Sequence, residues 1–86
     1  MTLISKYIIY GKEFCKYCTK AKEYLNEKNI NYTYIDLDNE EDLHDELKEQ
    51  YNIKTIPIIF FEQDEKIFVG GYVDLLKHYE STFSLN

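Results

Sequence analysis

The stretch YIIYGKEFCKYC, residues 7–18, contains both cysteines of the chain and joins two segments of different periodicity. Ser5–Tyr10 predicts a short strand, apolar enough to be buried on both of its faces. Lys16–Lys28 predicts a helix, because apolar side chains recur along it on one face, namely Cys18, Ala21 and Leu25. The pair Cys15-Lys16-Tyr17-Cys18 therefore lies where a strand gives way to a helix.

This placement favours reactive thiol chemistry. A thiol in the first turn of a helix meets unpaired backbone N–H groups and the positive end of the helix dipole, and both favour the thiolate. Lowering a thiol pKa from about 8.5 to about 5 takes on the order of 5 kcal/mol. The helix end and one N–H bond supply part of this, so nearby lysines are expected to supply the rest: Lys12, Lys16 and Lys20.

The cysteine pair has two other possible roles. A structural disulfide is disfavoured because such a short loop removes little entropy from the unfolded chain. A structural zinc ion needs four ligands. The histidines available for it, His44 and His78, lie far apart on different predicted helices. A redox pair is therefore the favoured interpretation, in which Cys15 is the nucleophile and Cys18 resolves the mixed disulfide.

Length and composition predict one small domain over residues 1–86. The start of the chain lacks the pattern of a secretory signal, and no apolar run approaches membrane-spanning length. We therefore expect a cytoplasmic protein without a membrane partner. The net charge is −6 and no arginine is present. Because nucleic-acid binding needs a basic stripe, no nucleic-acid partner is expected.

The remaining pattern predicts a β-α-β-α-β-β-α order. Asn31–Leu37 alternates as a strand, Asn39 is the expected N-cap of a second helix, and Gln63–Glu65 is the expected turn of a hairpin. The second helix is expected to bury Leu43, Leu47 and Tyr51. The hairpin strands are Ile58–Phe61 and Lys66–Val69, and the last helix is expected to bury Val73, Leu76, Tyr79 and Phe83. The first two strands should be parallel, because a helix connects them.

Three separated motifs in this order resemble the glutaredoxins, within the thioredoxin fold. They are Cys15-Lys16-Tyr17-Cys18 after the first strand, Thr55-Ile56-Pro57 before the third, and Gly70-Gly71-Tyr72-Val73-Asp74 after the fourth. The resemblance implies an α/β thioredoxin-like fold with a four-stranded mixed sheet and three helices. It also implies a cis Ile56-Pro57 bond that faces the active cysteine. The family often has proline after the first cysteine, where this chain has Lys16.

The resemblance further implies a site for glutathione as co-substrate, with no metal expected. Asp74 would hold the α-ammonium of the glutamyl end, while Lys12 and Lys54 would meet the charge at the other end. The backbone of Ile56 would pair with the cysteine of the tripeptide. The other residues implied in this site are Tyr17, Thr55, Pro57, Gly70, Gly71, Tyr72 and Val73.

The function implied is that of a dithiol glutaredoxin, a glutathione-dependent thiol–disulfide oxidoreductase that reduces protein disulfides and glutathionyl mixed disulfides. Two alternatives stay open. The chain could be a hydrogen donor to ribonucleotide reductase that is itself reduced by a flavoprotein. It could also bind an iron–sulfur cluster together with glutathione, as some glutaredoxins do. A monomer is expected, with glutathione and disulfide-containing or glutathionylated proteins as partners.

Overall fold

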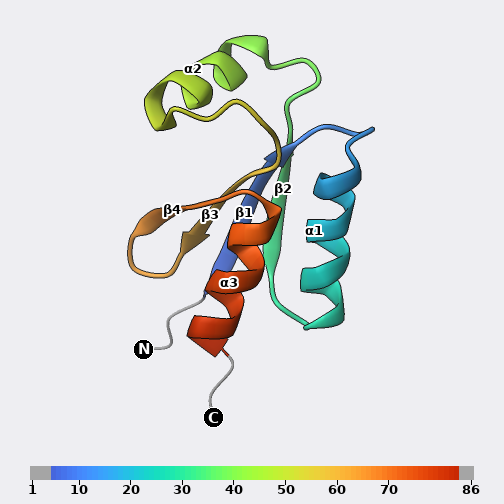
Figure 1. Ribbon diagram of the computed structural model, residues 1–86, viewed down its shortest axis with the longest axis vertical. Coiled ribbons are helices and arrows are strands. Elements are labelled where there is room, and N and C mark those ends of the chain that lie inside the picture. The colour runs from blue at the N-terminus through green and yellow to red at the C-terminus, as the bar shows by residue number, and fades with distance from the viewer. Residues whose placement is uncertain (1–4, 84–86) are drawn as a thin grey trace.

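The chain alternates strands and helices in the predicted order, as seen in a computed structural model that describes residues 5–83 (Figure 1). The elements are β1 (Lys6–Gly11), α1 (Lys16–Glu27), β2 (Tyr32–Asp36), α2 (Glu41–Tyr51), β3 (Ile58–Glu62), β4 (Lys66–Gly70) and α3 (Tyr72–Phe83). The order β-α-β-α-β-β-α is confirmed. The prediction that the start of the chain lacks a secretory signal concerns residues 1–4, which lie outside the described range.

The four strands form one mixed sheet in the order β2-β1-β3-β4. β1 and β2 are parallel, and their register pairs Ile9 with Tyr34. β3 runs antiparallel to both of its neighbours. The β3–β4 turn is closed by a hydrogen bond of 3.2 Å from the Gln63 N–H to the Glu65 carbonyl. The mixed sheet and the closing hairpin are therefore as predicted.

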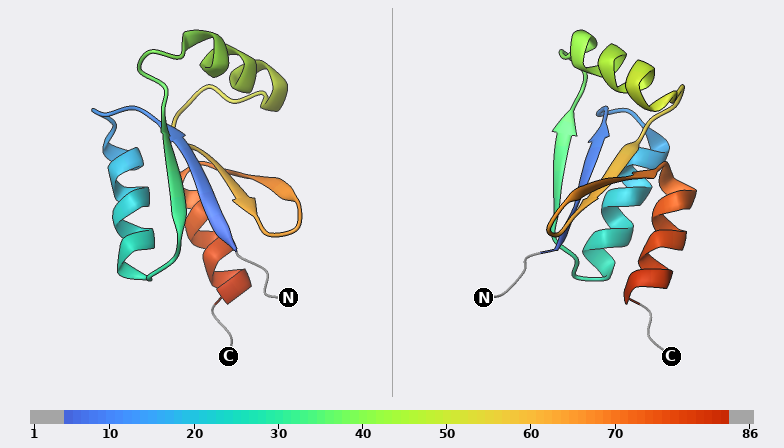
Figure 2. Two further views of the ribbon diagram at one scale, coloured as in Figure 1. Left: turned by 180° about the vertical axis from the view of Figure 1, so that it is seen from behind. Right: turned by 90° about the vertical axis from the view of Figure 1, so that its left-hand side faces the viewer.

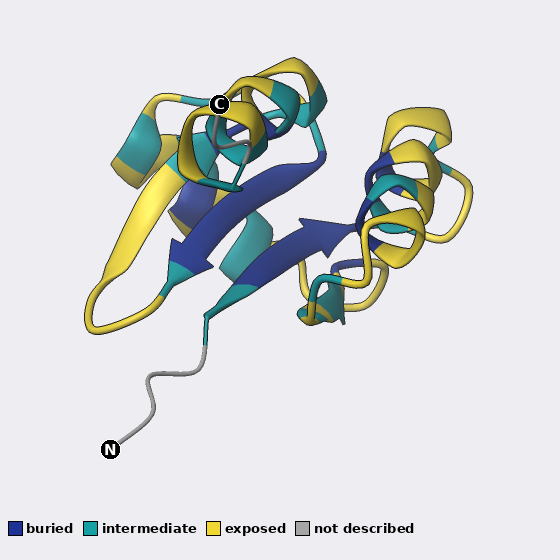
Figure 3. Cartoon of the chain, turned by 90° about the horizontal axis from the view of Figure 1, so that it is seen from below, coloured by how far each residue is buried: buried dark blue, intermediate teal, exposed yellow. Residues whose placement is uncertain are grey.

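Helices α1 and α3 lie side by side against one face of the sheet (Figures 1 and 2). The predicted face of α1 is confirmed, since Cys18, Ala21 and Leu25 are fully buried. Under these helices, Tyr7 and Ile9 of β1 pack with buried side chains of α1, β3 and α3 in the main core. The strand that leads to the cysteines is thus fixed inside the main core, and Figure 3 shows its buried course.

Helix α2 lies across the end of the sheet at which β1 and β2 finish (Figure 2). Leu47 is buried in a second core with residues of β1 and β3, and Leu43 and Tyr51 pack at its edge, as predicted. The N-cap prediction was wrong by one residue. Glu40, rather than Asn39, precedes the first helical residue, and its side chain makes no capping hydrogen bond.

The predicted buried stripe of α3 was partly wrong. Leu75 is the fully buried residue of this helix, whereas Val73 is 59% exposed. Phe83 packs against the main core as expected. The helix begins at Tyr72, and Leu75, which holds it against the core, directly follows Asp74.

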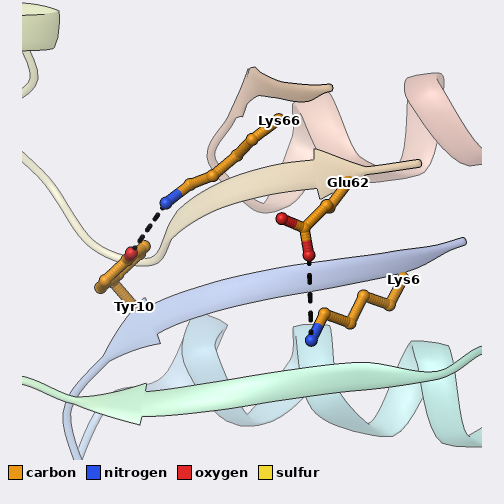
Figure 4. Close-up of polar contacts among 4 residues, drawn as sticks. All are labelled: Lys6, Tyr10, Glu62 and Lys66. Atoms are coloured by element: carbon orange, nitrogen blue, oxygen red, sulfur yellow. Dashed lines mark hydrogen bonds and ion pairs between the residues drawn. The ribbon is translucent and has the colours of Figure 1, made fainter. Parts of the chain in front are cut away.

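The face of the sheet turned away from α1 and α3 is partly covered by long side chains. Lys66 Nζ lies 3.2 Å from the Tyr10 hydroxyl and 4.8 Å from the centre of the Phe60 ring. Lys6 and Glu62 form an ion pair of 3.9 Å across β1 and β3 (Figure 4). Because lysine stems are apolar, they shield the sheet while their ammonium groups stay in water. Within residues 5–83, no helix is long and apolar enough to cross a membrane.

Candidate active site

The two cysteines occupy the junction between β1 and α1. Cys15 has extended backbone angles (φ −128°, ψ 113°) and is the N-cap of α1. Its carbonyl accepts the Thr19 N–H at 3.0 Å, which is the first hydrogen bond of the helix. Its Sγ accepts the Cys18 N–H at 3.2 Å. The sulfur therefore takes the place that a serine or aspartate oxygen usually occupies at a helix start, where negative charge is favoured.

Cys15 and Cys18 are joined as a disulfide, with their Cα atoms 5.1 Å apart. Their exposure differs sharply. Cys15 is half-buried, whereas Cys18 is 0% exposed and packs in the stripe of α1. A reagent from solution can reach the first sulfur but not the second. The division between an attacking Cys15 and a resolving Cys18 stays a prediction, and this difference in exposure is the observation that bears on it.

Two lysines of α1 lie beside the aromatic ring of the cysteine motif. Lys16 Nζ and Lys20 Nζ lie 5.9 Å and 5.5 Å from the centre of the Tyr17 ring. Tyr17 is half exposed. Among the described residues, neither lysine forms an ion pair with a carboxylate. Their positive charge therefore remains available to favour an anion near the start of α1.

The loop before Cys15 is held by the end of β2 and the residues that follow it. The Leu37 N–H donates to the Gly11 carbonyl at 2.7 Å. The Tyr34 hydroxyl donates to the Lys12 carbonyl at 2.8 Å. The Glu13 N–H donates to the Asp38 carboxylate at 3.2 Å. These bonds anchor the last residue of β1 and the first two residues of the loop, so the position of Cys15 depends on the neighbouring strand.

On its other side, the motif borders a shallow cleft of about 400 Å³. Its lining is mainly apolar and comes from the three motifs that the sequence singled out: Tyr17, Thr55, Ile56, Pro57, Gly71, Tyr72, Val73 and Asp74. The Tyr17 and Tyr72 rings lie 5.7 Å apart, centre to centre. The Ile56-Pro57 peptide is cis, as the resemblance implied. The structure thus brings eight of the predicted binding residues together.

Asp74 has a defined contact within the chain. Its Oδ2 accepts the Gly71 N–H at 3.0 Å, so the third residue of α3 caps the start of its own helix. Gly70 has φ +129°, and a Cβ there would collide with the Asp74 carboxylate. This explains why glycine is needed at that position. An ionised carboxylate can accept several hydrogen bonds, so Asp74 can also accept a ligand ammonium group.

Three predicted binding residues do not line this cleft: Lys12, Lys54 and Gly70. Gly70 is buried behind Asp74, and Lys54 is exposed. Burial, then the charges of Lys48 and Lys12, lower the pKa of His44 in α2. A long ligand would have to extend beyond the cleft to meet both lysines.

Sequence reasoning missed Tyr34 and Asp38 as parts of the site. The alternation of β2 placed Tyr32 and Tyr34 on one face, but it did not indicate which loop they would contact. Sequence reasoning also missed the contact of His78 with the core, where its Nδ1 lies 2.7 Å from the buried Tyr7 hydroxyl. Within residues 5–83, no group of three or more His, Cys, Asp or Glu side chains is arranged to hold a metal ion.

Comparison with known proteins gives a consistent result. Residues 7–69 match the family described as Glutaredoxin. Glutaredoxin-1 of Rhizophagus irregularis is 38% identical over 72 residues, which cover 80% of this chain and 68% of that protein. Glutaredoxin 1 of Rickettsia felis is 41% identical over 66 residues, covering 74% and 62%. The chain thus spans about two thirds or less of the curated relatives that it matches.

Solved structures agree. Glutaredoxin 1 from Francisella tularensis, complexed with cacodylate, superposes with a TM-score of 0.70 at 30% identity, covering 94% of this chain and 99% of that one. A buckwheat glutaredoxin–glutathione complex has a TM-score of 0.73, with 90% and 70% coverage. At 22% identity, it shows the shared fold alone. The fold and the Cys15–Cys18 pair at disulfide distance place the chain in the class of dithiol proteins with a thioredoxin fold. Within that class, the chain belongs to the glutaredoxin family.

Proposed function

We propose that this chain is a dithiol glutaredoxin that reduces protein disulfides and glutathionyl mixed disulfides with glutathione as co-substrate. One observation carries the proposal. A half-exposed Cys15 at the start of α1 is paired with a fully buried Cys18. Such a pair has one sulfur that a substrate can reach and one that is kept for the second step.

The chemistry is thiol–disulfide exchange, in which each S–S bond that forms replaces one that breaks. The Cys15 thiolate attacks the glutathionyl sulfur of a mixed disulfide, forms a new S–S bond and expels the substrate thiolate, which takes up a proton. A glutathione thiolate then attacks the same glutathionyl sulfur, so that glutathione disulfide leaves and the Cys15 thiolate returns. With a protein disulfide, Cys15 first forms a mixed disulfide with one protein sulfur. The Cys18 thiolate then attacks Cys15 Sγ, the bond from Cys15 to the protein breaks, and the protein leaves as a thiolate that takes up a proton. Two glutathione molecules then reduce the Cys15–Cys18 disulfide by the same exchange and leave as glutathione disulfide.

We assign the glutathione site to the cleft beside Tyr17. The start of α3 and Asp74 would take the charged glutamyl end of the tripeptide, because a helix N-terminus favours a carboxylate and an aspartate favours an ammonium group. The backbone of Ile56, just before the buried Pro57, would pair with the peptide in the manner of an added strand. Gly71 leaves room there, since a Cβ would meet only the Pro57 carbonyl, at 3.8 Å.

The remaining contacts in this proposal lie farther out. Lys12 and Lys54 would meet the carboxylate at the other end of glutathione as point charges, since the chain has no arginine for a two-pronged contact. Disulfide-containing and glutathionylated proteins are the proposed macromolecular partners, with ribonucleotide reductase as one candidate. We propose a monomer of one domain over residues 1–86, acting in the cytoplasm.

A coupled assay tests this function. Reduction of a glutathionylated thiol is followed with glutathione and glutathione reductase, and in parallel with thioredoxin reductase in place of both. We expect turnover only in the first mixture. Turnover only in the second would instead support the flavoprotein-reduced donor. A brown colour with visible absorbance after anaerobic purification would support the iron–sulfur alternative.

A further inference from the structure

Gly11 marks a crowded point behind the cysteine pair. A Cβ at this position would lie 2.5 Å from Cys18 Sγ and 2.6 Å from the Tyr34 hydroxyl oxygen. Both atoms therefore border the same small space at the end of β1. The tyrosine hydroxyl brings a polar group beside a sulfur that is otherwise buried in the apolar stripe of α1.

Tyr34 is held firmly in this place. Its hydroxyl donates to the Lys12 carbonyl at 2.8 Å, and Lys22 Nζ lies 4.1 Å from the centre of its ring. Burial, followed by the charges of Asp36 and Asp38, raises the pKa of Tyr34. The phenol therefore keeps its proton at neutral pH and remains a hydrogen-bond donor.

We propose that Tyr34 is a positioning residue for the resolving step, in which its hydroxyl holds the loop at Lys12 and stabilises the Cys18 thiolate. The proposal rests on the dithiol function proposed above. When Cys18 is separated from Cys15, its sulfur must lose a proton inside the core, where an unpaired charge is unfavourable. The hydrogen that Tyr34 gives to Lys12 in the disulfide form can then be shared with this sulfur.

The step itself balances as an exchange reaction. The Cys18 thiolate forms a bond with Cys15 Sγ, the bond from Cys15 to the substrate sulfur breaks, and the substrate leaves as a thiolate that takes up the proton given up by Cys18. A donor beside Cys18 makes its thiolate more available at a given pH. Tyr34 should therefore affect this step more than the first attack by Cys15.

The reduced protein treated with 5,5′-dithiobis(2-nitrobenzoate) separates the two steps without glutathione. Attack by Cys15 releases one yellow nitrothiolate at a rate that depends on reagent concentration. Attack by Cys18 releases the second at a rate that does not. In Tyr34→Phe, we expect the second phase to slow by about fivefold, the effect of one net hydrogen bond. Its pH midpoint should rise, while the first phase changes less than about twofold.

Tyr32→Phe is the matched control. Tyr32 lies on the same face of β2, but its hydroxyl accepts from the Asn26 side chain at the far end of α1. The proposal is overturned if the second phase and its pH midpoint match those of Tyr32→Phe, or if Tyr34→Phe slows both phases equally. The proposed function fails separately, if the wild type shows both phases but no turnover with glutathione.

Discussion

Asp74 offers a test that separates the architecture of the site from ligand binding. Its carboxylate accepts the Gly71 N–H at 3.0 Å and is also the proposed partner of the glutathione ammonium group. Asp74→Asn keeps an oxygen that can accept the Gly71 N–H but removes the charge. Asp74→Ala removes both. Comparing the two variants therefore divides any loss between helix capping and charge.

The expected magnitudes follow from these contacts. Asp74 is exposed, so its charge contact with a ligand falls at the upper end of the range for exposed ion pairs, at about 1 kcal/mol. This corresponds to an increase of about fivefold in the apparent KM for glutathione in Asp74→Asn. Asp74→Ala should show a similar or larger increase. It should also lower Tm, because losing the cap costs about 0.5–1.5 kcal/mol.

The assay is steady-state reduction of a glutathionylated thiol at varied glutathione concentration, repeated at low and high salt. The gap between wild type and Asp74→Asn should narrow at high salt, because screening already weakens the wild-type contact. Alkylation of Cys15 should change little. An unchanged KM in both variants would refute the assignment of the glutamyl end to the start of α3.

Three other predictions concern the thiolate, the packing behind it and the response to acid. Alkylation of Cys15 by iodoacetamide should have a pH midpoint well below about 8.5. Lys16→Pro should raise this midpoint modestly, and proline is tolerated there because it is the first position of the helix. A wild-type midpoint of about 8.5 would show that the helix end and the lysines do not favour the thiolate. Gly11→Ala should destabilise the fold by about 1–3 kcal/mol in urea unfolding, since the new Cβ would lie 2.5 Å from Cys18 Sγ; unchanged stability would show that the space is not tight. Burial lowers the pKa of His78, so the unfolded chain binds a proton at this residue more readily than the folded chain does. The free energy of unfolding should therefore fall as pH drops below about 6.5. His78→Gln should flatten this dependence of stability on pH, and an equal dependence in both proteins would contradict the prediction.

The elements could be predicted where local pattern decides the structure. The buried stripe of α1 was predicted correctly. Cys18, Ala21 and Leu25 lie on one face of the helix, and packing that face against the core is the one way to bury them together. The stripe of α3 was predicted only in part. This helix has apolar side chains on more than one face, and Val73, which borders the exposed cleft, was wrongly placed in the core. Local periodicity cannot tell a core side chain from one that lines an exposed cleft.

Contacts between distant segments could not be predicted from local pattern. The bond from Tyr34 to Lys12 joins residues 22 apart in the chain, and that between Tyr7 and His78 joins residues 71 apart. Both depend on which strands and helices become neighbours and in which register. The cis Ile56-Pro57 bond was predicted only through the family resemblance, because the residues alone favour a trans bond.

The most direct test of the central claim is to trap the glutathione adduct. Cys18→Ser and Cys15→Ser are each treated with glutathione disulfide, and intact mass with peptide mapping locates any bound glutathione. We expect Cys18→Ser to gain one glutathione rapidly and only on Cys15, because that residue is partly exposed and lies at the helix start. Cys15→Ser should react far more slowly, because Cys18 is 0% exposed. Equal labelling of both variants, or no labelling of Cys15, would contradict the assignment of Cys15 as the nucleophile.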